Sequence, residues 1–236
     1  AAELLASHTF YVLPILNPDG AALYTRENAN KVDLNRDAQQ LSQRESIVLR
    51  SLFDSIQPDI CLNMHDQRSI FGLAGGFPAT VSFLAPAAEV LKSITPARQE
   101  AMALIVKMTR YLKDHCPNKI GRFDDTFNQH CLGDTFSSLG VPTILFEAGH
   151  YTNDYNREQT RSFVFYALIA LCAPEDDKHN VSLDYKEYYS LPENKKNFHD
   201  LVLYNVRTPG DAILKTVCFQ YKEVLIDATI VFDLYV

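Results

Sequence analysis

Two arginines and several side-chain amides gather in one polar segment that directly follows an apolar run. The segment begins with Asn17-Pro18-Asp19-Gly20 and continues from Arg26 through Asn28, Asn30 and Asp33-Leu34-Asn35-Arg36 to Asp37. Guanidinium and amide donors match the geometry of a carboxylate, so this segment is suited to hold an anion. Asn-Pro-Asp-Gly alone would indicate only a solvated turn. The full pattern, with each arginine flanked by turn-forming amides, favours side chains held in place.

A histidine and a glutamate stand at the ends of two predicted strands. His65 is either a polar strand terminus or a zinc ligand through an imidazole nitrogen. Glu147 ends an apolar strand, where loss of water raises the pKa of a carboxyl group and suits it to act as a general base. The alternative is an exposed glutamate that caps a neighbouring helix. Glu147 and His150 also form E-x-x-H, a possible metal half-site with His65 as the third ligand, but that spacing suits a helix face rather than a strand end.

The elements that must position these residues alternate between strands and helices. Strands are predicted at Thr9–Leu16, Asp59–His65 and Thr143–Phe146. Helices are predicted at Ser42–Ile56, with Ser42 and Glu45 as a capping box, at Thr95–His115, with Pro96 in the first turn, and at Glu158–Cys172. Phe71–Leu84 and Gly121–Gly140 are rich in turn residues and are predicted to be irregular. This alternation predicts an α/β fold with a mixed, mostly parallel sheet and helices on both faces, and sites in such folds gather at the carboxyl ends of strands.

The composition changes after Pro174. A polar linker, Glu175–Lys178, precedes three β-rich segments at Leu201–Val206, Thr216–Ile226 and Ala228–Val236. We therefore expect an α/β domain over residues 1–174 and a small β-rich extension over residues 175–236.

Length and composition exclude several classes of function. With 236 residues, of which 47% are hydrophobic, the chain can bury one sizeable core. A formal charge of −7 without a basic cluster argues against nucleic acid as a partner. No apolar run is long enough to cross a membrane, and no signal peptide is visible. The five scattered cysteines indicate reduced thiols in a reducing compartment, so we expect a cytoplasmic location.

The order of these motifs resembles the zinc metallocarboxypeptidase family, the carboxypeptidase A-like group, over about residues 8 to 172. The resemblance rests on Asn17-Pro18-Asp19-Gly20, then an arginine and Asp33-Leu34-Asn35-Arg36, then the strand-end histidine and glutamate. It implies a zinc-exopeptidase-like fold and a carboxypeptidase-like catalytic domain. In that family an H-x-x-E pair and a later histidine hold zinc, a glutamate activates the zinc-bound water, and an arginine stabilises the oxyanion.

Carried onto this chain, the resemblance assigns a role to each candidate. His65 is similar to the third zinc ligand, Glu147 to the general base and Arg26 to the oxyanion arginine. Asn35 and Arg36 resemble the pair that grips the terminal carboxylate of the substrate. The implied reaction is hydrolysis of the C-terminal peptide bond of peptides that carry a free carboxylate.

The chain departs from the family pattern at several positions. None of its seven histidines begins an H-x-x-E pair, so we expect the other two zinc ligands upstream, a catalytic domain that is N-terminally incomplete, and a fragment that is inactive as it stands. In that family a mobile tyrosine, in the loop before the general base, binds the substrate. This residue has no clear counterpart here, because Tyr111 lies in a predicted helix while Phe123 and Phe127 stand nearer to that loop position. Gly133, at the specificity position, indicates no preference for basic side chains.

Two other functions stay open. Aspartoacylase-like and succinylglutamate desuccinylase-like enzymes share a motif like Asp33-Leu34-Asn35-Arg36, whose last two residues form a carboxylate clamp, and they cleave N-acyl amino acids. Asn-Pro-Asp-Gly and the upstream arginine, however, favour a peptidase. A degenerate member of the family would bind carboxylate-ended peptides without cleaving them. An α/β domain with accidental motif matches is the remaining, simplest interpretation.

Overall fold

A mixed four-stranded sheet forms the centre of the computed structural model, which describes residues 6–173, 184–210 and 212–235. Its strands are β1 (Cys61–Asp66), β5 (Thr143–Ala148), β3 (Val81–Leu84) and β4 (Ile120–Arg122), in the spatial order β1-β5-β3-β4. β1 runs parallel to β5 and β3 parallel to β4, while β3 and β5 are antiparallel. The predicted mixed, mostly parallel sheet is confirmed.

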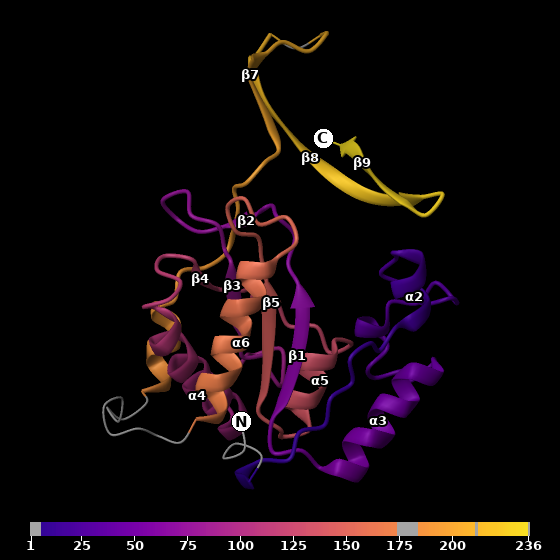
Figure 1. Cartoon of the computed structure of the whole chain (residues 1–236), viewed down its shortest axis with the longest axis vertical. Coiled ribbons are helices and arrows are strands. Elements are labelled where there is room, and N and C mark those ends of the chain that lie inside the picture. The colour runs from indigo at the N-terminus through magenta and orange to yellow at the C-terminus, as the bar shows by residue number, and fades with distance from the viewer. Residues whose placement is uncertain (1–5, 174–183, 211, 236) are drawn as a thin grey trace.

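Helices cover both faces of this sheet (Figure 1). α4 (Pro96–Leu112) and α6 (Glu158–Cys172) pack together on one face, over a core that includes Val81, Phe83, Ile144 and Phe146. α5 (Leu132–Ser138) lies against the other face, where Gly133 is close to Asn63 of β1. The sheet therefore has an apolar face under α4 and α6 and a second face that carries polar side chains.

β1 lies at one edge of the sheet, and of the described residues only those of β5 pair with it. Leu62 and Met64 of β1 are exposed, so the prediction of a buried strand here is wrong in its burial. The predicted strand at Thr9–Leu16 is also wrong, because residues 9 to 16 form no strand and are mostly exposed. An apolar run becomes a strand only where a neighbouring strand takes its backbone hydrogen bonds.

Regular structure occurs in both segments that were predicted to be irregular. Phe71–Leu84 contains β2 (Phe71–Gly72) and the fully buried β3. Gly121–Gly140 contains α5 and the end of β4. β3 is short and buried on both faces, so it lacks the alternation that marks a strand in a sequence.

The three predicted helices are confirmed as α3 (Arg44–Ile56), α4 and α6, with one error in capping. The Thr95 side chain accepts a hydrogen bond from the Arg98 backbone amide, as expected of an N-cap. Ser42 is not the N-cap of α3. Its hydroxyl instead donates to Asp37 over 2.7 Å, and Gln43 takes the cap position.

The last part of the chain forms a separate sheet. Residues 184–196 first pack against the body through the 3₁₀ helix η2 (Tyr185–Ser190), whose Tyr188 is fully buried, and through β6 (Lys195–Lys196), which pairs with β2. β7 (Leu201–Val206), β8 (Lys215–Ile226) and β9 (Thr229–Tyr235) confirm the predicted β-rich segment, and they form an antiparallel sheet in that order. We call β7–β9 the C-terminal sheet; it stands beyond the carboxyl end of β1 (Figure 1).

The predicted linker and the division between residues 174 and 175 lie outside the described residues, so the two-domain organisation stays a prediction. Within residues 6–173, 184–210 and 212–235, no helix is long and apolar enough to cross a membrane. All five cysteines are free thiols.

Candidate active site

The polar segment from Asn17 to Asp37 is held in shape largely by its own amides. Asn17 caps the short helix α2 (Pro18–Leu23): its side-chain oxygen accepts from the Gly20 amide over 2.9 Å, and its side-chain nitrogen donates to the Arg26 carbonyl over 3.1 Å. The buried Asn28 side chain accepts from the backbone amides of Asn30 and Val32. These contacts fix the turn that presents Arg26.

The second arginine, Arg36, is the last residue of a 3₁₀ turn, η1 (Leu34–Arg36), which is capped by the Asp33 side chain. Asn35 accepts a hydrogen bond from the Leu132 amide over 3.1 Å, so it is tied to the first residue of α5. The Arg36 side chain is exposed and donates to the Asn35 carbonyl over 2.8 Å. It makes no ion pair with a carboxylate of the described residues, so its guanidinium can bind an anion from outside the chain.

His65 and Glu147 are neighbours across the parallel pair β1 and β5. Partners in register place their side chains on the same face of a sheet, here the face that α5 covers. The Nε2 atom of His65 is buried and has no hydrogen-bond partner among the described residues. Burial, with the charges of Arg26 and Arg36, lowers the pKa of His65, so the ring is neutral and able to act as a ligand or acceptor.

Glu147 is only 7% exposed, and its environment suits a base. Burial, assisted by the negative charge of Asp66, raises the pKa of Glu147 to about 8, while Arg26 opposes this shift. A carboxyl group with such a pKa exchanges its proton close to neutral pH, as a general base requires.

The structure brings the sequence-predicted residues to one end of the sheet. Arg26 lies close enough to act electrostatically on both His65 and Glu147, and Arg36 acts on His65. Arg26 itself is paired through Nε with Asp33 over 2.7 Å and remains largely exposed. The predicted catalytic and binding roles of these residues stay predictions.

Arg157 ties together the two strand ends that carry His65 and Glu147. It lies at the start of α6 with a left-handed φ of 59°. Its guanidinium donates to Asp66 over 2.9 Å, to the Ala148 carbonyl over 2.5 Å and to the Gln67 carbonyl over 3.1 Å. Because these partners directly follow or adjoin the site residues, Arg157 fixes the distance between the ends of β1 and β5.

A close backbone contact fixes the end of β5 as well. The Gly149 amide donates to the Thr80 carbonyl over 2.8 Å. A Cβ atom at this position would lie 1.9 Å from the Ala79 carbonyl oxygen. Only glycine lets β5 end this close to residues 79 and 80.

A series of hydrogen bonds near the site joins residues that no sequence motif indicated. Ser82, the register partner of Glu147, donates to Asn194 over 3.0 Å, and Asn194 donates to the buried Gln67 over 2.6 Å. Gln67 in turn donates to the Ala79 carbonyl over 2.8 Å. Ser82 sits in a strand that the sequence pattern hid, and Asn194 lies in the predicted extension, so no local motif marked them.

The described residues do not complete a zinc site. They contain no group of three or more histidine, cysteine, aspartate or glutamate side chains arranged to hold a metal ion. The orphaned Nε2 atom of His65 fits one ligand position, but a protein zinc site needs at least three protein ligands. The E-x-x-H interpretation of Glu147 and His150 with His65 is therefore wrong, since these three residues form no such group.

The loops that contain Gln39, residues 88–90 and residues 127–129 form a pocket of about 350 Å³ together with α5. Its lining residues include Phe127, which stands near the predicted place of the mobile tyrosine, and Asp134, which follows Gly133 at the predicted specificity position. None of Arg26, Arg36, His65 and Glu147 lines it, so it adjoins the candidate site rather than containing it.

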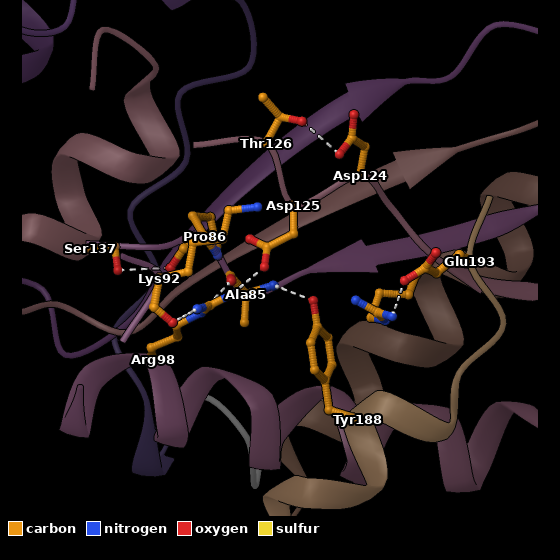
Figure 2. Close-up of polar contacts among 11 residues, drawn as sticks. Ala85, Pro86, Lys92, Arg98, Asp124, Asp125, Thr126, Ser137, Tyr188 and Glu193 are labelled. Carbon is orange, nitrogen blue, oxygen red and sulfur yellow. Dashed lines mark hydrogen bonds and ion pairs between the residues drawn. The ribbon is translucent and has the colours of Figure 1, made fainter. Parts of the chain in front are cut away.

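A buried arginine fastens these loops to the body (Figure 2). The side chain of Arg98, on α4, is 1% exposed and pairs with Asp125 over 2.7 Å. It also donates to the carbonyls of Ala85 and Lys92. The Ala85 amide donates to the hydroxyl of Tyr188, so η2 is joined to the same cluster.

We expect Arg98→Met to lower the free energy of unfolding by about 3–5 kcal/mol, because it leaves Asp125 and two carbonyls without their buried partner. Denaturant titration measures this. Arg50→Met, which removes an exposed pair with Asp54 on α3, is the control and should cost less than about 1 kcal/mol. Equal effects of the two changes would contradict a structural role for Arg98.

The buried Asp134 should make the stability of the protein depend on pH. Burial raises its pKa from 3.8 to about 6, so the folded state holds the proton more tightly than the unfolded state. Stability is therefore lost as pH rises from about 4 to 6 and stays lower above that range. The free energy of unfolding of Asp134→Asn should equal that of the natural protein near pH 4 and should be higher by up to about 3 kcal/mol at pH 8. Parallel stability curves for the two proteins would contradict this.

Comparison with solved structures shows the same fold in a known enzyme. A metallo-carboxypeptidase from Burkholderia cenocepacia matches with a TM-score of 0.55 and 19% identity, over 72% of this chain and 46% of that protein. The chain thus spans less than half the length of that relative. The murein-tripeptide amidase MpaA from Escherichia coli O157 matches with a TM-score of 0.37 and 19% identity, over 68% of this chain and 67% of that one. No protein-family model matches the sequence, and no curated protein is significantly similar to it.

Proposed function

We propose that this chain is part of a zinc-dependent metallocarboxypeptidase that hydrolyses the C-terminal peptide bond of peptides. The observation that supports this most is the meeting of Arg26, Arg36, His65 and Glu147 at one end of a sheet whose fold is that of a metallo-carboxypeptidase. A carboxylate clamp, a buried base and a neutral imidazole are the groups that such a reaction needs from these positions.

Each side chain has a physical task in this proposal. Arg36, beside Asn35, holds the terminal carboxylate of the peptide, because a guanidinium can donate two parallel hydrogen bonds to it. Glu147 takes the proton of the attacking water, and its pKa of about 8 suits that transfer. Arg26 lies close enough to Glu147 to stabilise negative charge that develops on the carbonyl oxygen.

Within the described residues only His65 would hold zinc, so the remaining ligands would have to come from outside the described residues. A bound zinc ion would supply a Lewis acid that lowers the pKa of water. The described residues provide only part of a zinc site.

Assays on the natural full-length protein test the proposal. Peptides with a free C-terminus, the same peptides with a C-terminal amide, and N-acyl amino acids are offered separately, and only the first group should be cleaved. Turnover of the N-acyl amino acids alone would favour the aspartoacylase-like function. Binding of free-carboxylate peptides without any cleavage, in a protein whose gene lacks an H-x-x-E pair, would favour a degenerate binding protein.

A further inference from the structure

One glutamate of the C-terminal sheet joins two segments that flank the candidate site. Glu223, on β8, accepts hydrogen bonds from the hydroxyls of Tyr24 and Tyr155, the latter over 2.8 Å. Tyr24 ends α2 just before Arg26, and Tyr155 lies in the loop between β5 and α6. The hydrogen bond to Glu223 raises the pKa of Tyr24 to about 12, so its hydroxyl remains a donor at neutral pH.

The face of the C-terminal sheet that carries Glu223 is otherwise apolar. Strand register places five apolar or aromatic side chains on that face: Tyr221, Leu225, Ile230, Phe232 and Leu234. The ring of Phe232 lies 6.1 Å from that of Tyr155, so this face is turned toward the body. Yet the five side chains are between 39% and 53% exposed. We call this face of the C-terminal sheet, with its five apolar or aromatic side chains and Glu223, the inner face.

The inner face and the carboxylate clamp of Asn35 and Arg36 contact different segments around the site. Asn35 is tied to Leu132 at the start of α5, whereas Glu223 contacts Tyr24 and Tyr155 and acts electrostatically on Asp66, at the end of β1. A peptide whose carboxylate is held at Arg36 and whose terminal bond lies at Glu147 can therefore extend toward the C-terminal sheet.

We propose that the inner face binds the part of a peptide substrate that precedes the scissile bond, and that it selects apolar side chains there. The proposal rests on the carboxypeptidase function proposed above. Five half-exposed apolar side chains offer a surface for such a side chain. Glu223 places a carboxylate on the inner face itself, which disfavours an acidic side chain at the same place.

Few contacts hold the C-terminal sheet in this position. Most of its residues are exposed, and Gln220 is its only buried side chain among the described residues. At its base Gln220 donates to the Phe198 carbonyl over 2.9 Å, and the Tyr221 amide donates to Asp200 over 2.7 Å. Arg68 also donates a hydrogen bond to the hydroxyl of Tyr235 on β9, and the contacts of Glu223 with Tyr24 and Tyr155 add to these few links between the sheet and the site.

The first experiment compares two N-acetylated peptides that differ only in the residue before the scissile bond, leucine or aspartate. The natural full-length protein should show a kcat/KM about tenfold higher for the leucine peptide, since a buried apolar side chain contributes on this scale. Phe232→Ala should reduce this preference severalfold. Val231→Ala, on the opposite face of β9, should leave it unchanged.

The outcomes separate this inference from the proposed function. Hydrolysis of neither peptide would overturn the carboxypeptidase function, and this inference with it. Hydrolysis of both peptides at equal rates would overturn the inference alone. Equal losses of preference in Phe232→Ala and Val231→Ala would also overturn it, because the effect would not belong to the inner face.

A second experiment needs no activity. In Glu223→Ala, the amide hydrogens of β8 and β9 should exchange with deuterium about tenfold faster or more, because the sheet is no longer joined to Tyr24 and Tyr155. Lys222→Ala, on the other face of β8, is the control and should not change the exchange. Unchanged exchange in Glu223→Ala would show that Glu223 does not hold the sheet, and would overturn the proposed position of the inner face.

Discussion

Glu147→Gln in the natural full-length protein is expected to lower kcat by about 10³-fold while KM changes little. Glutamine keeps the size of the side chain but cannot accept the proton of the attacking water. Glu147 is buried, and this burial raises its pKa to about 8, which suits the carboxylate to take up that proton. Steady-state kinetics on a peptide with a free C-terminus measures the effect, and the zinc content of both proteins should be equal.

Glu158→Gln provides the matched control for this change. Glu158 is exposed, begins α6 and pairs with Arg161 at the surface. Its substitution should leave kcat within about twofold, because exposed ion pairs contribute little. Near-normal turnover of Glu147→Gln would remove Glu147 from the role of general base. Loss of zinc from that variant would instead indicate a ligand role.

Arg36→Ala is expected to raise KM by about 10–100-fold for peptides with a free C-terminus and to matter little for peptides whose C-terminus is amidated. A hydrogen bond to a charged group contributes roughly 1.5–3 kcal/mol, which corresponds to that range. The exposed guanidinium of Arg36, without a carboxylate partner among the described residues, is placed to supply it. The difference between the two peptide series is the quantity to measure.

Arg50→Ala controls for the loss of a positive charge near the same segment of chain, since Arg50 pairs only with Asp54 on α3 among the described carboxylates. It should affect neither peptide series. If Arg36→Ala raised KM equally for free and amidated peptides, the carboxylate clamp would have to be assigned to other residues.

The long helices and the sheet class could be predicted from sequence because their signals are local. Thr95 and Pro96 mark the start of α4 within one turn, and the apolar stripe of α6 repeats at helical spacing. β3 was missed because a short strand buried on both faces shows no alternation. The strand predicted at Thr9–Leu16 failed for the opposite reason: its pattern is correct, but pairing is not a property of the segment alone.

The candidate site could be predicted only in part. The polar segment, His65 and Glu147 carry their signal in residue type and position at a strand end, and the structure brings them together. Ser82, Asn194 and Arg157 were missed because each acts through residues distant in the chain. In the sequence, their amide, hydroxyl and guanidinium groups cannot be told from those of ordinary surface residues. Only folding brings them close to the ends of β1 and β5.

The free side of β1 has a practical consequence for anyone who produces this chain. An outermost strand with exposed apolar residues, here Leu62 and Met64, offers backbone groups that a strand from another molecule can join. Preparations of the chain by itself should therefore tend toward self-association and precipitation at high concentration. Replacing Met64 by lysine would introduce the kind of charge with which natural sheets block such edge-to-edge growth.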